Sequence, residues 1–226
     1  MKRKIYVETS VISYLTARPS KTILGAAHQQ ITLAWWETRN QYELLVSESV
    51  LRECGAGDPD AAQKRLAVLN DVPLLLITEQ ALNIAESLVR QGILPPKAVE
   101  DALHIAVATV NGVDYLLTWN CRHIANPEIQ RGIAAYLWNR LVCSFRLSAP
   151  RKNFLEKKML NDEIVDEVRA IRDTHAAKFG YDPRAIYEDL KKSEAEHIAA
   201  GHPFVPPPSV PPVPTSSLQR TRFARR

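Results

Sequence analysis

Three carboxylates in this sequence stand where each could serve a reaction on a phosphate group. Glu8 ends a short apolar stretch, Glu53 lies shortly after a second one, and Asp101 lies near the start of a long one. Carboxylates that crowd together cannot all ionise without a compensating cation. Oxygen ligands with few His or Cys nearby select Mg²⁺ or Mn²⁺. Such a cation can activate water and stabilise a phosphoryl transition state, so the chemistry to test is phosphodiester hydrolysis.

The elements that would position these side chains alternate between strand-like and helix-like patterns. Helix starts are marked by Asp58 before Pro59, a cap followed by proline at the first helical position, and Gly92 marks a helix end. Strands separated by helices favour an α/β fold with a parallel sheet and helices on both faces. The predicted strands are 4–8, 42–47, 73–78 and 113–119, and the predicted helices are 10–17, 22–39, 48–54, 58–70, 79–92 and 96–112.

In open α/β sheets, ligands bind outside the carboxyl ends of the strands. Glu8 ends the first predicted strand and Asn120 follows the fourth, so both are predicted at this rim. Glu53 and Asp101 reach the same rim if the intervening turns fold that way. Two alternatives stay open: Glu48 competes with Glu53, and Asn120 is either a ligand or a turn residue.

Four further polar residues accompany the acids: Thr9, Ser10, His104 and Thr118. Thr9 and Ser10 are expected to cap the next helix and could also meet a phosphate. His104 lies one turn from Asp101 on the same helix face, which fits either an orienting role for a metal ligand or a structural histidine. Thr118 is either a strand hydroxyl or a substrate contact.

Composition limits the class of protein. A chain of 226 residues with 46% hydrophobic content can bury one domain and carry an appendage. No apolar run approaches the ~18 residues that span a bilayer, and no signal peptide is expected. Three cysteines at unrelated spacings argue against a disulfide framework and predict a cytoplasmic location. The net charge of +4 comes entirely from the four arginines of 203–226, so any polyanion must be held locally or through metal.

The sequence divides into three predicted regions. Residues 1–149 form the main α/β domain. Residues 150–202 form a helical extension with helices 161–180 and 181–201, the first amphipathic, and residues 203–226 form a Pro- and Arg-rich disordered tail. The apolar stripe predicted for the first helix of the extension contains Ile164, Val168, Ile171 and His175.

The segments YVETSVISYL, VSESVLREC, EDALHIAVA and DYLLTWNCRHIAN, in this order, resemble the PIN domain. They are most similar to the VapC-like toxins of bacterial type II toxin–antitoxin systems, over roughly residues 4–140. The resemblance implies a three-layer α/β/α sandwich, a Mg²⁺- or Mn²⁺-dependent endoribonuclease that hydrolyses RNA phosphodiesters, and a homodimer. It implies site positions at Glu8, Glu53 and Asp101 as metal ligands, with Asn120 at a fourth, more variable position.

Two departures from the family pattern support a rival interpretation. The first position is usually Asp, and Glu8 moves the carboxylate by about one C–C bond, ~1.5 Å. After the HIAN block the match is loose, and only LVCSFRL could supply the expected last strand. The rival is a catalytically inactive PIN-like module for RNA binding or regulatory interaction. A nuclease acting on structured DNA is a third, weaker hypothesis.

The extension has a resemblance of its own. NDEIVDEVRAIRDTHAAKFGYDPRAIYEDLKK resembles small helical proteins encoded beside such toxins, which implies an antitoxin-like segment. Residues 160–202 would then inhibit their own nuclease at an effective concentration up to the millimolar range. The alternatives are a separate cognate antitoxin, or helices that simply pack on the domain or on a second copy. One of the adjacent Trp35 and Trp36 could serve a dimer interface.

Overall fold

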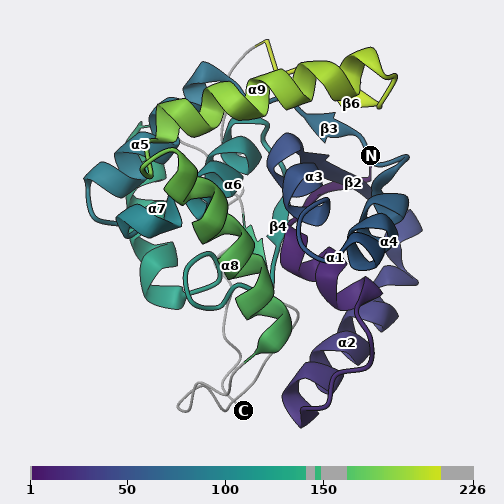
Figure 1. The fold of residues 1–226 in the computed structure, drawn as a ribbon. Coiled ribbons are helices and arrows are strands. Elements are labelled where there is room, and N and C mark those ends of the chain that lie inside the picture. The colour runs from purple at the N-terminus through teal and green to yellow at the C-terminus, as the bar shows by residue number, and fades with distance from the viewer. Residues whose placement is uncertain (1, 141–145, 149–161, 210–226) are drawn as a thin grey trace.

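A computed structural model describes residues 2–140, 146–148 and 162–209 (Figure 1). The described strands form one sheet in the order β5-β4-β1-β2-β3-β6, and every pairing is parallel. The central strand is β1, where Ile5 lies opposite Leu44 of β2 and Tyr115 of β4. The strand bounds are β1 Arg3–Val7, β2 Tyr42–Ser47, β3 Leu74–Leu75, β4 Tyr115–Leu117, β5 Arg146–Ser148 and β6 Phe204–Val205.

The helices cover both faces of the sheet. The chain runs from β1 to β3 in one direction and then returns to β4 and β5 on the other side of β1. Right-handed crossovers then place α1–α4 on one face and α5–α7 on the other, as Figure 1 shows. The fold is therefore α/β and compatible with a three-layer sandwich. The helix bounds are α1 Thr9–Thr16, α2 Ile23–Trp36, α3 Glu48–Cys54, α4 Pro59–Leu69, α5 Glu79–Arg90, α6 Val99–Val110, α7 Pro127–Arg140, α8 Glu163–Lys178 and α9 Pro183–Ala199.

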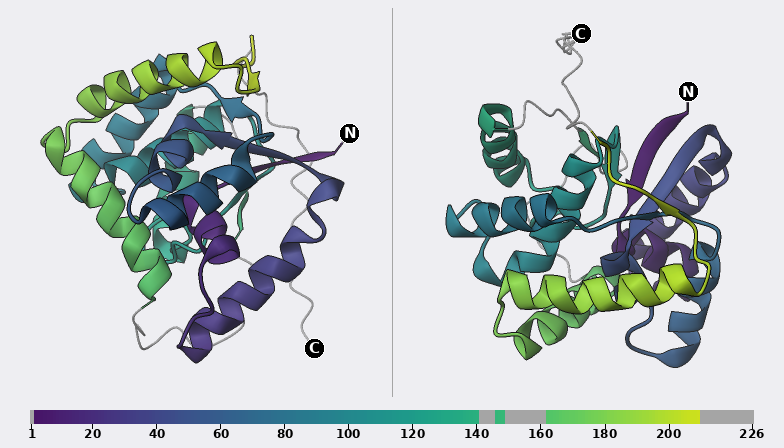
Figure 2. Two further views of the ribbon diagram at one scale, coloured as in Figure 1. Left: turned by 45° about the vertical axis from the view of Figure 1, so that its right-hand side comes forward. Right: turned by 90° about the horizontal axis from the view of Figure 1, so that it is seen from above.

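The return from β3 to β4 creates a switch point at the carboxyl ends of β1 and β4. In open α/β sheets the crevice at such a point is the usual ligand site. The extension closes this rim, because α8 packs against α1, α3 and α6. Figure 2 shows α9 continuing along α5 and α3, both of which it contacts.

Local sequence signals explain where several helices begin. The Asp58 side chain accepts a hydrogen bond from the Ala61 amide (2.9 Å) at the start of α4. Asp162 and Asp182 cap α8 and α9 in the same way. Gly92 follows α5 with φ of +70°, a left-handed conformation that favours glycine. The cap at Asp58 and the glycine after α5 confirm the sequence prediction.

The core is centred on α6, the helix that carries Asp101. Every residue from Val99 to Val110 is buried, as the apolar character of the segment predicts. This helix packs against α5 and β4 and faces α8. A helix buried on all sides holds its polar side chains in fixed positions, which suits a site that depends on geometry.

The structure corrects the sequence prediction at the sheet edges. The third predicted strand, 73–78, is reduced to Leu74–Leu75. The tail predicted to be disordered begins with a strand: β6 pairs with β3, and the Leu74 amide donates to the Pro203 carbonyl (2.8 Å). This pairing satisfies an edge that would otherwise expose unpaired amides, and it uses the carbonyl that proline retains. The rest of the tail, 210–226, lies outside the described residues.

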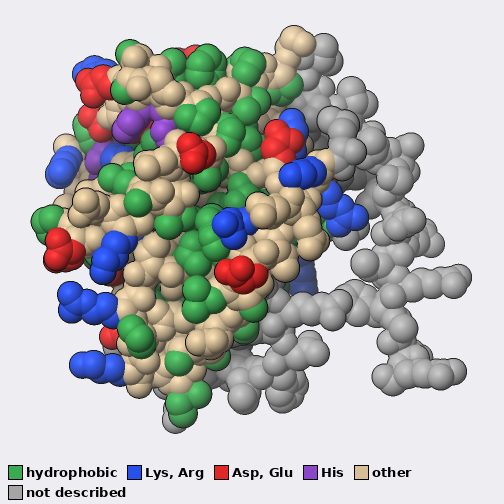
Figure 3. Space-filling view, turned by 90° about the vertical axis from the view of Figure 1, so that its right-hand side faces the viewer, with side chains coloured by type: hydrophobic (Ala, Val, Ile, Leu, Met, Phe, Trp, Pro, Cys, Tyr) green, Lys and Arg blue, Asp and Glu red, His purple; other side chains and the backbone are tan. Residues whose placement is uncertain are grey.

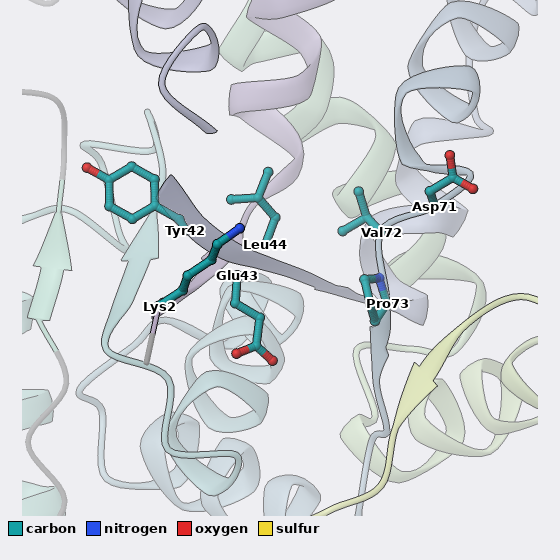
Figure 4. A pocket seen from close by; sticks show the side chains of 7 residues that line it. All are labelled: Lys2, Tyr42, Glu43, Leu44, Asp71, Val72 and Pro73. Carbon is teal, nitrogen blue, oxygen red and sulfur yellow. The ribbon is translucent and has the colours of Figure 1, made fainter. Parts of the chain in front are cut away.

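The surface and the ends of the sheet add two observations. On the face seen in Figure 3, Lys and Arg side chains are interspersed with Asp and Glu among hydrophobic ones. A pocket of about 470 Å³ lies beside the amino-terminal ends of β1, β2 and β3, lined by Lys2, Tyr42, Glu43, Leu44, Asp71, Val72 and Pro73 (Figure 4). It is therefore at the opposite end of the sheet from the switch point. None of the helices in the described part of the chain has the length and apolar character needed to cross a membrane.

Candidate metal centre

The structure brings the four predicted acidic and amide side chains together at the switch point. Glu8 directly follows β1, Glu53 lies on α3, Asp101 lies in the first turn of α6, and Asn120 follows β4. All four are buried, with exposed fractions of 0%, 0%, 4% and 1%. The Asn120 Nδ2 donates to Asp101 Oδ1 at 3.0 Å. Two helices and two strand ends thus converge on one buried polar cluster.

Glu8 is held by hydroxyl groups from both sides of the switch point. Its Oε2 accepts hydrogen bonds from the Ser10 hydroxyl and from Thr118 Oγ1, the latter at 2.6 Å. Ser10 in turn accepts from the Trp119 amide (2.8 Å), and Thr118 accepts from the Asn120 amide (2.9 Å). The polar residues after β1 and β4 therefore orient the carboxylate in place of a solvent shell.

Glu53 is oriented by a buried chain of hydrogen bonds. Thr9 donates to its Oε2, and His104 Nε2 lies 3.0 Å from its Oε1. The other ring nitrogen of His104 is 2.7 Å from the Tyr6 hydroxyl, which is 2.6 Å from Ser47 Oγ. Both nitrogens of the imidazole are engaged, which fits a residue that positions a ligand.

Asp101 has a partner that the sequence analysis missed. His123 Nδ1 lies 2.7 Å from Asp101 Oδ2, and the His123 amide donates to Asn120 Oδ1 (3.3 Å). The sequence analysis assigned no role to His123. Its place three residues after Asn120, in the turn that follows β4, was the available signal.

The donor set fits a metal ion. Ligand atoms of Glu8, Glu53 and His104 lie within 4.8 Å of one another, and all three residues are buried. This trio differs in one member from the predicted set, which had Asp101 in place of His104. The reason is geometric: His104 faces Glu53 across the cluster, whereas Asp101 is drawn toward Asn120 and His123. Two carboxylates beside an imidazole and a third carboxylate form a site rich in oxygen.

A guanidinium from the extension lies in this cluster. Arg172 of α8 places Nε 2.9 Å from Glu53 Oε1, Nη2 2.8 Å from Glu53 Oε2 and Nη1 2.5 Å from Asp101 Oδ1, and Nη2 also contacts Glu8. The side chain is buried. One planar fork thus bridges all three predicted carboxylates, with contacts up to 164 residues apart in sequence. It supplies the compensating cation that such a cluster requires.

The electrostatics follow from this contact. Burial alone would raise the pKa of Glu53, but Arg172 and His104 outweigh it and hold that pKa well below its usual range. Burial likewise opposes ionisation of Asp101, and Arg172 together with His123 lowers its pKa. Burial would lower the pKa of Arg172, whereas the carboxyl groups around it raise it well above its usual value. The cluster and the guanidinium therefore stabilise each other's charged forms.

Arg172 was not predicted, although the sequence carried a signal. The buried stripe of α8 contains Ile164, Val165, Val168, Arg172, His175 and Ala176, and Ile171 is only partly buried. Arg172 therefore occupies an apolar-stripe position, four residues after Val168 and three before His175. A charged residue at such a position needs a buried partner, and the acidic rim was the only set of acids already predicted to lie in a core.

Other contacts fix α8 and α9 beside the cluster. Glu100, next to Asp101, accepts from Arg52 (2.8 Å) and contacts His175 of α8. Glu48, the competitor of Glu53, faces α9, where His197 Nδ1 lies 2.8 Å from its Oε2. The geometry thus separates the two candidates: Glu53 belongs to the cluster, and Glu48 belongs to the contact with the extension.

Comparison of the chain with models of known protein families, with curated proteins and with solved structures found no match.

Proposed function

We propose that this protein is a metal-dependent endoribonuclease of the PIN-domain, VapC-like toxin type, restrained by its own C-terminal helix. The observation that carries the proposal is the set of carboxyl groups at the switch point, whose compensating cation is Arg172 from the extension. A cluster built only for stability would gain more from apolar packing than from a buried ion group. The position at the carboxyl ends of parallel strands further favours a site for a ligand.

Each residue of the cluster has a role in this proposal. Glu8 and Glu53 hold Mg²⁺ or Mn²⁺, with Asp101 and Asn120 completing the oxygen-rich side of the site. Such a cation supplies charge stabilisation at the scissile phosphate and lowers the pKa of water. His104 orients Glu53, while hydroxyls after β1 and β4 orient Glu8. The same residues then exclude bulk water, because the whole cluster is buried.

The restraint follows from charge and space. Arg172 contacts the same carboxylate oxygens that a divalent cation needs, so the guanidinium and the cation cannot occupy the site together. The extension is covalently attached, and a tethered segment acts at an effective concentration up to the millimolar range. In the same proposal the chain acts in the cytoplasm, and active molecules form a homodimer or are held by a cognate antitoxin, as the resemblance implies.

The test uses the full chain. Arg172→Met removes the guanidinium and keeps most of the side-chain volume. Cleavage of a mixed RNA pool in Mg²⁺ or Mn²⁺ is compared among the parent, Arg172→Met, and Arg172→Met combined with Asp101→Asn. Arg169→Met is the matched control, since Arg169 lies one turn earlier and pairs with Asp166 at the surface. Circular dichroism verifies that each variant is folded.

The expected result is metal-dependent cleavage by Arg172→Met only. Cleavage by the parent and Arg172→Met alike would keep the nuclease and remove the restraint. A folded Arg172→Met that neither cleaves RNA nor responds to the cations would contradict the nuclease. Cleavage that persists with Asp101→Asn would place the activity outside this cluster.

The second candidate function is an inactive PIN-like module for RNA binding or regulation. It is favoured by one observation: Arg172 already satisfies the carboxyl groups in the folded chain, so the cluster is complete without metal. Glu8 in place of the usual Asp points the same way. Glu8→Asp in the Arg172→Met chain separates the two, because cleavage restored only by Asp would mean that the activity has been lost in this chain.

A further inference from the structure

The residue that caps the start of α8 makes a second buried polar contact, away from the acidic cluster. Asp162, the N-cap of α8, accepts a hydrogen bond from the Tyr14 hydroxyl, and its Oδ2 lies 3.3 Å from His28 Nδ1. His28 Nδ1 is also 2.8 Å from the Tyr14 oxygen. Tyr14 and His28 are almost fully buried, with exposed fractions of 1% and 3%. None of the three residues belongs to the metal centre.

The positions of the protons make this contact a binding site for anions. Tyr14 has one hydroxyl proton, and Asp162 receives it. The 2.8 Å contact between Tyr14 and His28 therefore requires the imidazole to donate from Nδ1. Burial would raise the pKa of Asp162, but His28, Tyr14 and the Val165 amide outweigh it and lower that pKa, so the carboxylate is charged. The Tyr14 hydroxyl thus donates to the carboxylate, and the Nδ1–H group that donates to Tyr14 also lies 3.3 Å from Asp162 Oδ2.

The two donors are held rigidly and are joined to the metal centre. The His28 ring stacks on Trp119, with ring centroids 4.0 Å apart, and Trp119 Nε1 donates to Thr32 (2.9 Å). The Trp119 amide donates to Ser10, the residue that donates to Glu8. The donors also lie on α1 and α2, the helices that follow the strand carrying Glu8. A ligand that replaced α8 at both places would meet side chains that these contacts already hold in position.

Along α8, a positive charge lies at the carboxyl groups and a negative charge lies at Tyr14 and His28. A nucleic acid bound through a metal ion would present its charges in the same order. Arg172 puts a cation among the carboxyl groups, and Asp162 puts an anion on the pair of donors. Glu163 adds a second carboxylate near the same end, accepting from Ser20 (3.3 Å). Ten residues of helix correspond to about 15 Å, or about four steps of a stacked strand at ~3.4 Å per nucleotide. A backbone phosphate of the substrate would therefore fall where Asp162 lies.

We infer that Tyr14 and His28 form a subsite for a backbone phosphate of the RNA substrate, a few nucleotides from the scissile one. The Asp162 carboxylate occupies this subsite in the restrained chain, as Arg172 occupies the place of the cation. The inference rests on the proposed function, because it names how the same nuclease holds its substrate. A pair of hydrogen-bond donors selects a phosphodiester oxygen and carries no base specificity.

The experiment measures RNA affinity in the full chain without cleavage. The background is Arg172→Met with Asp101→Asn, and the probe is a fluorescent single-stranded RNA of twelve nucleotides. Tyr14→Phe is expected to weaken binding about tenfold, the loss of one hydrogen bond to a charged group. His28→Gln is expected to weaken it similarly. Asp162→Ser, which keeps a capping side chain, is expected to tighten binding by removing the competing carboxylate.

Tyr42→Phe is the matched control, since Tyr42 begins β2 at the other end of the sheet. Replacing one phosphate of the probe at a time by a neutral methylphosphonate then locates the subsite. At one position of the probe, the methylphosphonate should weaken binding to the background chain. The same replacement should have no further effect on binding to the chain that also carries Tyr14→Phe. Unchanged affinity in both Tyr14→Phe and His28→Gln, or losses that add at every position, would overturn the subsite.

The proposed function is measured separately, by cleavage in Arg172→Met with Asp101 intact. Cleavage together with unchanged affinity in Tyr14→Phe would overturn the subsite and leave the nuclease standing. A folded chain that neither binds nor cleaves RNA would overturn both.

Discussion

At the residue scale, the hydrogen-bond chain behind Glu53 joins stability to the site. Tyr6 is fully buried between Ser47 and His104. Burial is the main cause that raises the pKa of Tyr6, so the phenol keeps its proton and its place in the chain. Tyr6→Phe leaves an imidazole nitrogen and a hydroxyl without a partner in the interior. Urea denaturation should show a free energy of unfolding lower by about 1–3 kcal/mol, with Tyr42→Phe as control. Equal midpoints for Tyr6→Phe and the parent would contradict this.

Single residues also mark what the sequence could and could not predict. Glu8, Glu53 and Asp101 were recognisable because each stands beside an apolar segment whose direction is readable locally. Arg172 and His123 were not, because their partners lie far from them in sequence or in another turn of the chain. A position in the apolar stripe of a helix indicates that its side chain is buried, but it does not indicate which surface covers it. The missing information was the docking of α8, which only the tertiary structure supplies.

At the element scale, the contact between α9 and α3 includes the buried carboxyl group of Glu48, for which burial disfavours the charged form. Glu48 is fully buried, and its Oε1 has no hydrogen-bond partner among the described residues. Burial raises its pKa from 4.5 to about 7, against the lowering effect of His197. Glu194 adds to the rise, and Arg52 opposes it. The folded chain therefore holds a proton there that the unfolded chain releases at lower pH.

The sign of the resulting pH dependence is fixed by this raised pKa. Between pH 4.5 and about 7 the folded state binds more protons at Glu48, so stability falls as pH rises through this window. Glu48→Gln removes the effect. Its free energy of unfolding relative to the parent should increase by up to about 3 kcal/mol from pH 4.5 to pH 8. Urea denaturation at both pH values measures it, and a difference that does not change with pH would contradict the assignment.

The elements themselves were largely predictable, although the strand predicted at 113–119 is reduced to Tyr115–Leu117 and α7 was not predicted. The helix predicted from Asp58 and Pro59 begins at Pro59, and the helix predicted at 181–201 begins at Pro183. The strand 73–78 shrank to two residues, and β6 was missed entirely. β6 is the edge strand and β3 is its neighbour, so the pairing on this side depends on which segment arrives there rather than on alternation of side chains. The composition of a proline-rich segment predicts disorder. Only the tertiary structure shows the sheet edge whose amide groups pair with it.

At the scale of the whole molecule, the extension completes the fold at the rim where the sheet changes direction. The extension supplies a cation to the carboxyl cluster and a carboxylate to Tyr14 and His28, and the start of the tail supplies a strand that pairs with β3. Apart from the tail, the chain has no net charge, so the binding of a polyanion in the proposed function would depend on this local arrangement. In the proposed function, the docking of α8 would therefore both complete the fold and restrain the site, and displacement of α8 would expose the rim that it covers.

This coupling predicts that metal stabilises the protein only when Arg172 is absent. Arg172→Met leaves three buried carboxyl groups without their cation, which should lower the free energy of unfolding by about 3–5 kcal/mol in a chelator. A cation that binds only the folded state then restores about 2.7 kcal/mol at a concentration one hundred times its Kd. Thermal unfolding should therefore respond to Mg²⁺ or Mn²⁺ in Arg172→Met and hardly at all in the parent. Adding Asp101→Asn should weaken the response, because it removes one charge from the cluster. An equal response of the parent and Arg172→Met would mean that the cation binds elsewhere, and that the guanidinium and the metal do not compete.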